Sequence, residues 1–159
     1  MATKAEIIAA IREGMDRVQD TFGNLSDEQL ATTVHSEEGG WSAKEILAHL
    51  AGRARGYELT FRLAEGETPS MPGGFNVNDW NRARIDERIG QSRDELLAEF
   101  RTVHEELIAR LETLPDAALG REIPRGPNVI TVGEALRLGG GQHSLNHTAE
   151  VEQALGLAQ

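Results

Sequence analysis

The alternation of apolar and polar residues follows a helical period in four segments of the chain. In each segment apolar residues recur every three or four positions, which places them on one face of a helix. Each segment also contains Ser or Thr followed three residues later by Glu, a reciprocal cap that satisfies the free backbone N–H groups of a helix start. In the first, second and fourth segments this cap is at the start, and in the third it lies inside the segment, after a start near Asn78 or Asp79. The caps are Thr3 with Glu6, Ser42 with Glu45, Ser92 with Glu95, and Thr131 with Glu134. The pattern predicts helices over residues 4–22, 42–64, 78–114 and 131–155, and no substantial sheet.

Two long connections separate the predicted helices, and both contain residues that interrupt helices. They are marked by Gly66, Pro69, Pro72, Gly73 and Gly74 in the first, and by Pro124, Gly126 and Pro127 in the second. The third helix is the longest, and it is interrupted or exposed near Gly90. This order is typical of an all-α fold, an antiparallel up-down-up-down four-helix bundle. We expect one domain over residues 1–159, since 159 residues form a core of ordinary size.

The composition of the chain excludes several kinds of binding partner and metal ligand. The formal net charge of −10 opposes binding to a phosphate backbone, and the chain has no cysteine, so any metal must be held by His, Asp or Glu. Residues 1–10 lack the basic region and apolar core of a secretion signal, and no apolar run approaches membrane-spanning length. We therefore expect a soluble, cytoplasmic protein with no nucleic-acid or membrane partner. A homodimer is left open.

Two histidines of the last predicted helix are candidate metal ligands. His143 and His147 are four residues apart, so on a helix their imidazoles project from one face, the spacing that two ligands of one ion need. A helical wheel places both on the apolar stripe of that helix. Two buried imidazoles cost free energy unless both find partners, and one ion satisfies both. Two histidines hydrogen-bonded inside the core are the alternative.

The neighbours of this pair add detail. Glu150 lies one turn beyond His147 on the same stripe. Residues 139–141 are three consecutive glycines, each of which weakens a helix by roughly 1 kcal/mol relative to Ala. They indicate a close backbone approach or a locally distorted helix ahead of His143.

Four sequence motifs resemble the DinB/YfiT-like superfamily. The motifs are Gly-Trp-Ser-Ala-Lys-Glu-Ile-Leu-Ala-His-Leu at 40–50, Asn-Asp-Trp-Asn at 78–81, Leu-Pro-Asp at 114–116, and Gln-His-Ser-Leu-Asn-His at 142–147. The resemblance spans nearly the whole chain and implies a metal-binding four-helix bundle. It also implies that His49, which borders the stripe of the second helix, joins His143 and His147 as a ligand of a divalent ion, zinc or nickel. Taken alone, His49 would be an ordinary boundary residue.

Three protein ligands leave one coordination position open for water or substrate, which is typical of a reactive site. The resemblance implies, first, a metal-dependent transferase that adds a low-molecular-weight thiol, such as bacillithiol or mycothiol, to an electrophilic small molecule in detoxification or stress response. The alternatives are a metal-dependent hydrolase of a small molecule and a non-catalytic metal-binding stress protein. A mycothiol-dependent isomerase is less favoured, because those enzymes carry a further C-terminal domain.

Three residues are candidates for binding a substrate: Arg53, Tyr57 and Trp80. Arg53 and Tyr57 lie one and two turns beyond His49, and the third helix is expected to face the site through Trp80. A surface arginine and two core aromatics are an equally supported interpretation. His35 and His104 match no ligand position and are expected at the surface or its boundary, and no general base is assigned.

Overall fold

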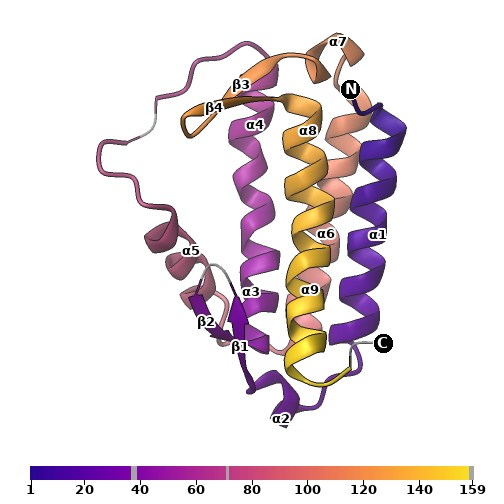
Figure 1. Ribbon diagram of the computed structural model, residues 1–159, viewed down its shortest axis with the longest axis vertical. Helices are drawn as coiled ribbons and strands as arrows, with labels where there is room; N and C mark the ends of the chain where they lie inside the picture. Colours follow the sequence, from indigo (N-terminus) through magenta and orange to yellow (C-terminus); the bar gives the residue numbers. More distant parts are fainter. Residues whose placement is uncertain (37–38, 71, 158–159) are drawn as a thin grey trace.

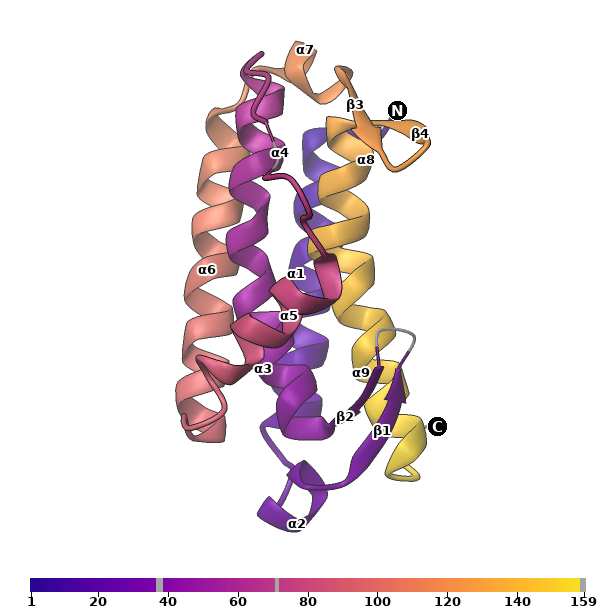
Figure 2. The same ribbon diagram turned by 90° about the vertical axis from the view of Figure 1, so that its left-hand side faces the viewer.

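The computed structural model describes residues 1–36, 39–70 and 72–157, and its long helical segments form four columns packed side by side (Figures 1 and 2). This confirms a mostly helical four-helix bundle. The four columns are α1 (Lys4–Phe22); α3 (Ala43–Arg53) continued through the 3-10 turn η1 (Ala54–Gly56) into α4 (Tyr57–Ala64); α6 (Arg93–Thr113); and α8 (Val132–Leu136) continued through the π-helical segment η2 (Arg137–Gln142) into α9 (His143–Ala154).

The predicted caps begin these columns. Thr3, Ser42 and Ser92 each accept a hydrogen bond from the backbone N–H three residues later, and the Glu at that position caps in return. Thr131 makes only the first half of this exchange, since the side chain of Glu134 binds Arg137 instead. Each helix therefore starts where its local sequence satisfies the free N–H groups.

The direction of the columns differs from the predicted up-down-up-down order. Lys4, at the start of α1, donates to the carbonyl of Leu114 just beyond α6, so these two helices run in opposite directions. The columns α3–α4 and α6 are instead parallel, because their first halves share one core cluster and their second halves share another. The reason is the connection from 65 to 92, which returns the chain to the end of the bundle where α3 begins (Figure 1).

The prediction of a single helix over residues 78–114 is also wrong. This segment forms two helices, α5 (Val77–Asp86) and α6, with turns between them. The side chain of Asn76 caps α5, which crosses α3 on the outside of the bundle (Figure 2). Arg88 fixes the break, since its buried guanidinium donates to Glu99 at 2.9 Å and to the carbonyl of Arg84 at 3.0 Å.

The sequence pattern missed four short elements. Two of them are the single-turn helices α2 (Asp27–Leu30) and α7 (Asp116–Leu119), and the described residues also form two antiparallel hairpins. The hairpins pair β1 (Thr33–Ser36) with β2 (Gly39–Ser42), and β3 (Glu122–Arg125) with β4 (Asn128–Thr131). Strands of four residues are too short for a clear period of two, and the bundle remains the main architecture.

Two apolar clusters form the core, one at each end of the bundle. Among the described residues, no helix is both long enough and apolar enough to cross a bilayer. The single domain, the cytoplasmic location, and the expected absence of nucleic-acid and membrane partners stay predictions.

Candidate metal centre

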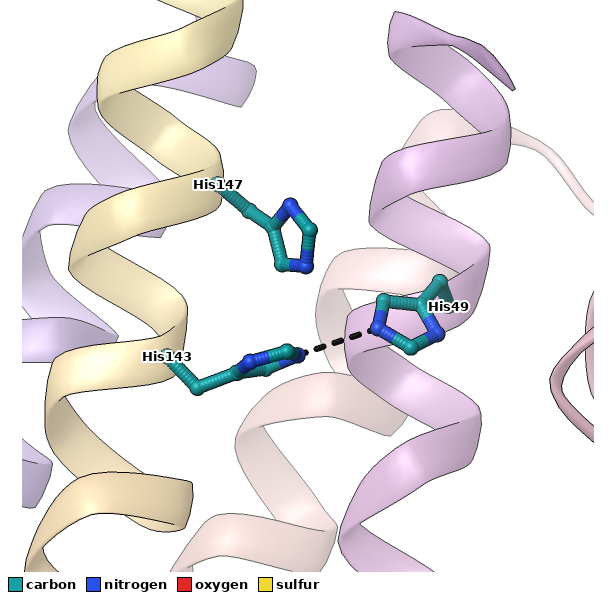
Figure 3. Close-up of side chains that lie close together, drawn as sticks. All are labelled: His49, His143 and His147. Carbon is teal, nitrogen blue, oxygen red and sulfur yellow. Dashed lines mark hydrogen bonds between the residues drawn. The ribbon is translucent and has the colours of Figure 1, made fainter. Parts of the chain in front are cut away.

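Three imidazoles meet in the space between α3 and α9 (Figure 3). His49 comes from α3, and His143 and His147 come from successive turns of α9. The Nε2 atoms of His49 and His143 are 3.0 Å apart, and one ligand nitrogen from each of the three rings lies within 4.8 Å of the others. The three residues singled out by the sequence therefore lie together.

The cluster is largely shielded from water. His49 and His147 expose 1% and 4% of their surface, and His143, the most exposed of the three, is half-buried. The ring of Trp41, at the end of β2, lies against His49 with 4.9 Å between ring centroids. Trp41 belongs to one of the family-like motifs, but nothing in the sequence indicated this contact.

The protonation state of the cluster suits metal binding. Burial, the positive charge of Arg53 and the neighbouring histidines hold the pKa of His143 far below its ordinary value, so this ring is neutral near pH 7. The Nδ1–H of His147 donates to Oε2 of Glu150 at 2.8 Å, so Nε2 is the nitrogen of that ring that would bind an ion. A carboxylate that orients a ligating histidine in this way is a common feature of metal sites.

The donor set fits a divalent ion. Zinc binds imidazole nitrogen at about 2.0–2.1 Å, so tetrahedral geometry separates the nitrogens by about 3.4 Å. The separations here, 3.0 Å for one pair and less than 4.8 Å for all, reach that geometry through small rotations of the rings. Three nitrogens also leave a position open, as in catalytic sites.

The glycine run ahead of His143 explains the path of the fourth column. A Cβ atom on Gly141 would lie 2.6 Å from the carbonyl oxygen of Ala10 in α1, and one on Gly140 would lie 2.9 Å from Cγ1 of Ile11. The same residues form η2, a π-helical segment, which places one extra residue in the turn. The predictions of a close backbone approach and of a distorted helix are both confirmed.

The residues predicted to bind substrate lie on two sides of α3. Arg53 is half-buried and hydrogen-bonds Tyr57, and the Tyr57 ring is pressed against η2, where a Cβ on Gly139 would lie 3.1 Å from its hydroxyl oxygen. Trp80 of α5 lies on the other side, where a Cβ on Gly56 would be 3.5 Å from its ring. A role for these three side chains in binding substrate stays a proposal.

Among the described histidines, His104 does not join the ligand set of the cluster. His104 was expected at the surface or its boundary, which is wrong: it is buried in α6 and donates from Nδ1 to the carbonyl of Phe100 at 2.8 Å. Burial lowers the pKa of His104 to about 4. The side chain of His35 lies outside the described part of the structure.

Two surface grooves of the bundle do not open on the cluster. A groove of about 170 Å³ follows α1 and α6, and one of about 340 Å³ follows α4 and α6. Tyr57 lines the second, but neither groove includes a histidine of the cluster. The donor set, rather than a cavity, therefore identifies the candidate site.

Comparisons with known proteins agree with this fold and donor set. The chain is 24% identical over 157 residues to YfiT of Bacillus subtilis, which is named as a proposed metal-dependent hydrolase. The match covers 96% of this chain and 86% of YfiT. It is 26% identical over 147 residues to a protein of Geobacillus thermodenitrificans with the same kind of name, covering 92% of this chain and 80% of the relative.

Solved structures share the fold. YfiT, whose bundle topology is described as unusual, matches with a TM-score of 0.75 at 22% identity, over 98% of this chain and 89% of YfiT. A mycothiol-dependent maleylpyruvate isomerase matches with a TM-score of 0.74 at 16% identity, over 95% of this chain and 63% of the isomerase. The family model of the DinB superfamily matches residues 10–151. The chain belongs to the DinB superfamily.

Proposed function

We propose that this protein is a metal-dependent hydrolase of a small molecule. The observation that carries the proposal is the group of three imidazole nitrogens within 4.8 Å of one another, of which those of His49 and His147 belong to buried side chains and that of His143 to a half-buried one. The names of the relatives in Bacillus subtilis and Geobacillus thermodenitrificans support a hydrolase. The thiol transferase, favoured by the sequence-based interpretation, becomes the second candidate, because no relative reported above is named as a transferase.

The residues of the chain have separate roles in this proposal. His49, His143 and His147 would hold a zinc or nickel ion, and Glu150 would orient His147. A divalent ion held there supplies Lewis acidity, which lowers the pKa of water to about 7 and polarises a carbonyl or phosphoryl group. In hydrolysis the oxygen of water bonds to the electrophilic atom of the substrate, the bond to the leaving group breaks, and the proton of water passes to the leaving group.

The residues around the ligands complete the site. Arg53 and Tyr57 would offer N–H and O–H donors to a polar group of the substrate. Trp80, half-buried beside Gly56, offers an apolar wall on the side of α5. Arg53 and Tyr57 lie one and two turns from His49 along the column α3–α4, so a small substrate could contact them together with the ligand set.

The test combines metal analysis with an activity screen. The purified protein is analysed for bound metal, loaded with zinc or nickel, and assayed on chromogenic esters, amides and phosphoesters, with and without bacillithiol or mycothiol. A hydrolase turns over a substrate without thiol, and His147→Ala abolishes the turnover. Asn146→Ala is the matched control. Asn146 precedes His147 on α9, is exposed, and accepts a hydrogen bond from the side chain of Gln142.

The other functions are distinguishable outcomes of the same screen. Turnover of an electrophile that depends on the thiol and on His147 would establish the transferase and overturn the hydrolase. Binding of one metal ion with no turnover over the whole panel would favour a non-catalytic metal-binding protein. Failure to bind any divalent ion would refute all three.

A further inference from the structure

Three side chains follow one another at intervals of one turn along the column α3–α4: His49, Arg53 and Tyr57. The first contacts His143 of α9, and the last contacts Gly139 of η2. The two columns run in opposite directions, so Arg53 lies between these two contacts. At a rise of 1.5 Å per residue, Arg53 is about 6 Å along the axis from each of its two neighbours in the row.

Arg53 links the two ends of this row. It lies one turn from the ligand His49 and one turn from Tyr57 on the same column. Its side chain hydrogen-bonds Tyr57. The guanidinium therefore lies beside the tyrosine hydroxyl and one turn from the ligand cluster.

Tyr57 keeps its proton in this position. Burial is the largest effect on its pKa and raises it above the ordinary value, against the opposing effect of Arg53. A neutral phenol that accepts a hydrogen bond from Arg53 still has its own O–H to donate. Arg53 and Tyr57 together thus present N–H and O–H donors beside the metal-binding nitrogens.

Arg53 contributes a positive charge to this row. The chain has a formal net charge of −10, yet the row places a guanidinium between the ligand His49 and Tyr57. Arg53 is half-buried, and a charge shielded from water interacts more strongly with a partner than one at the surface. The flat guanidinium also matches two oxygens of a carboxylate or a phosphate.

We propose that Arg53 and Tyr57 form an oxyanion subsite next to the three histidines, so that the substrate carries a carboxylate or phosphate group beside the bond that is cleaved. This inference rests on the proposed metal-dependent function and names its substrate class. The anionic group occupies Arg53 and Tyr57 while the reactive group faces His49, His143 and His147.

The experiment measures binding rather than turnover. The zinc-loaded full-length protein is titrated calorimetrically with acetate and with inorganic phosphate, and acetamide serves as the neutral counterpart of acetate. At least one anion should bind, and acetamide should not. Arg53→Gln should lower the affinity for the anion by at least about tenfold, since a hydrogen bond to a charged group contributes about 1.5–3 kcal/mol. Arg53→Lys should recover part of the lost affinity.

Arg55→Gln is the matched control for net charge. Arg55 lies two residues further along, exposes 58% of its side chain and pairs with Glu99 of α6 at 3.6 Å. This variant should change the affinity less than twofold. The metal content and melting temperature of every variant are measured, and if Arg53→Gln fails to fold, Tyr57→Phe removes one donor and should weaken the same anion severalfold.

The outcomes separate this inference from the proposed function. The subsite is overturned if the zinc-loaded wild type binds neither anion, or if Arg53→Gln and Arg55→Gln weaken binding equally. Anion binding that depends on Arg53 in a protein with no hydrolytic activity would keep the subsite and refute the hydrolase. Hydrolysis by a protein whose anion affinity is indifferent to Arg53 would refute the subsite alone.

Discussion

Gly141→Ala should destabilise the protein, although the same change stabilises most helices. The added Cβ would lie 2.6 Å from the carbonyl oxygen and 2.7 Å from the carbonyl carbon of Ala10. Ordinary van der Waals contacts begin about 0.7 Å further out. The obstructing atoms are backbone atoms of α1, so no side chain can rotate away, and α1 and η2 must separate.

The magnitude follows from two opposing effects. Extra atoms in a well-packed interior cost about 1–3 kcal/mol, whereas replacing Gly by Ala in a helix gains at most about 1 kcal/mol. Because the obstructing atoms are backbone atoms, the cost lies at the upper end of its range, and the expected loss in the free energy of unfolding is about 2 kcal/mol. For a chain of this size, this corresponds to a fall of about 4–8 °C in melting temperature. His143 follows two residues later, so metal affinity should fall with stability.

Urea unfolding followed by circular dichroism at 222 nm measures the change. Gly90→Ala is the matched control, because a Cβ there meets nothing within 4 Å and the backbone is not left-handed, and it should alter stability by less than about 0.5 kcal/mol. Gly140→Ala should have an intermediate effect, because its Cβ meets the side chain of Ile11, which can move. A Gly141→Ala variant as stable as the wild type would refute the close contact between α1 and η2.

Three further predictions concern the histidines. A chelator should lower the melting temperature of metal-loaded protein, since an ion at one hundred times its Kd stabilises the fold by about 2.7 kcal/mol; no response would contradict the site. Glu150→Gln should weaken metal binding about 10- to 100-fold in competition with a chromophoric chelator, whereas Glu13→Gln, at an exposed position of α1, should not. Burial lowers the pKa of His104 to about 4, whereas an ordinary histidine has a pKa of about 6.5, so as the pH falls the unfolded chain binds this proton first. The contribution of the neutral His104 ring to the free energy of unfolding should be fully present above about pH 6.5 and should decrease by up to about 3 kcal/mol toward pH 4. Urea unfolding across this pH range should show a shallower decrease for His104→Leu than for the wild type. An unchanged slope would count against the buried neutral ring.

The parts of the fold that local sequence determines were predictable. The first helix begins at Lys4 and ends at Phe22, as predicted, because its cap and its apolar period are both local signals. The break between α5 and α6 was harder to predict, because it depends on Arg88 binding Glu99 across the turn. The hairpins were missed because each strand has only four residues.

The candidate site shows the same division. The spacing of His143 and His147 is set within one helix, so the sequence alone showed that they share a face. The contact between His49 and His143 joins residues 94 positions apart, and only the family resemblance pointed to it. His104 was misplaced because its partner is the carbonyl of Phe100, a backbone group that no sequence pattern marks.

The topology and the metal site depend on each other. In a simple up-down-up-down bundle each helix packs beside the next one in sequence, so the second and fourth helices lie on a diagonal, about 14 Å apart if neighbouring axes are about 10 Å apart. His49 and His143 would then face each other across the whole core. Here the connection from 65 to 92 returns the chain before α6 begins, and α6 packs between α1 and α3. That placement leaves the other side of α3–α4 to the fourth column, which is why Nε2 of His49 lies 3.0 Å from Nε2 of His143.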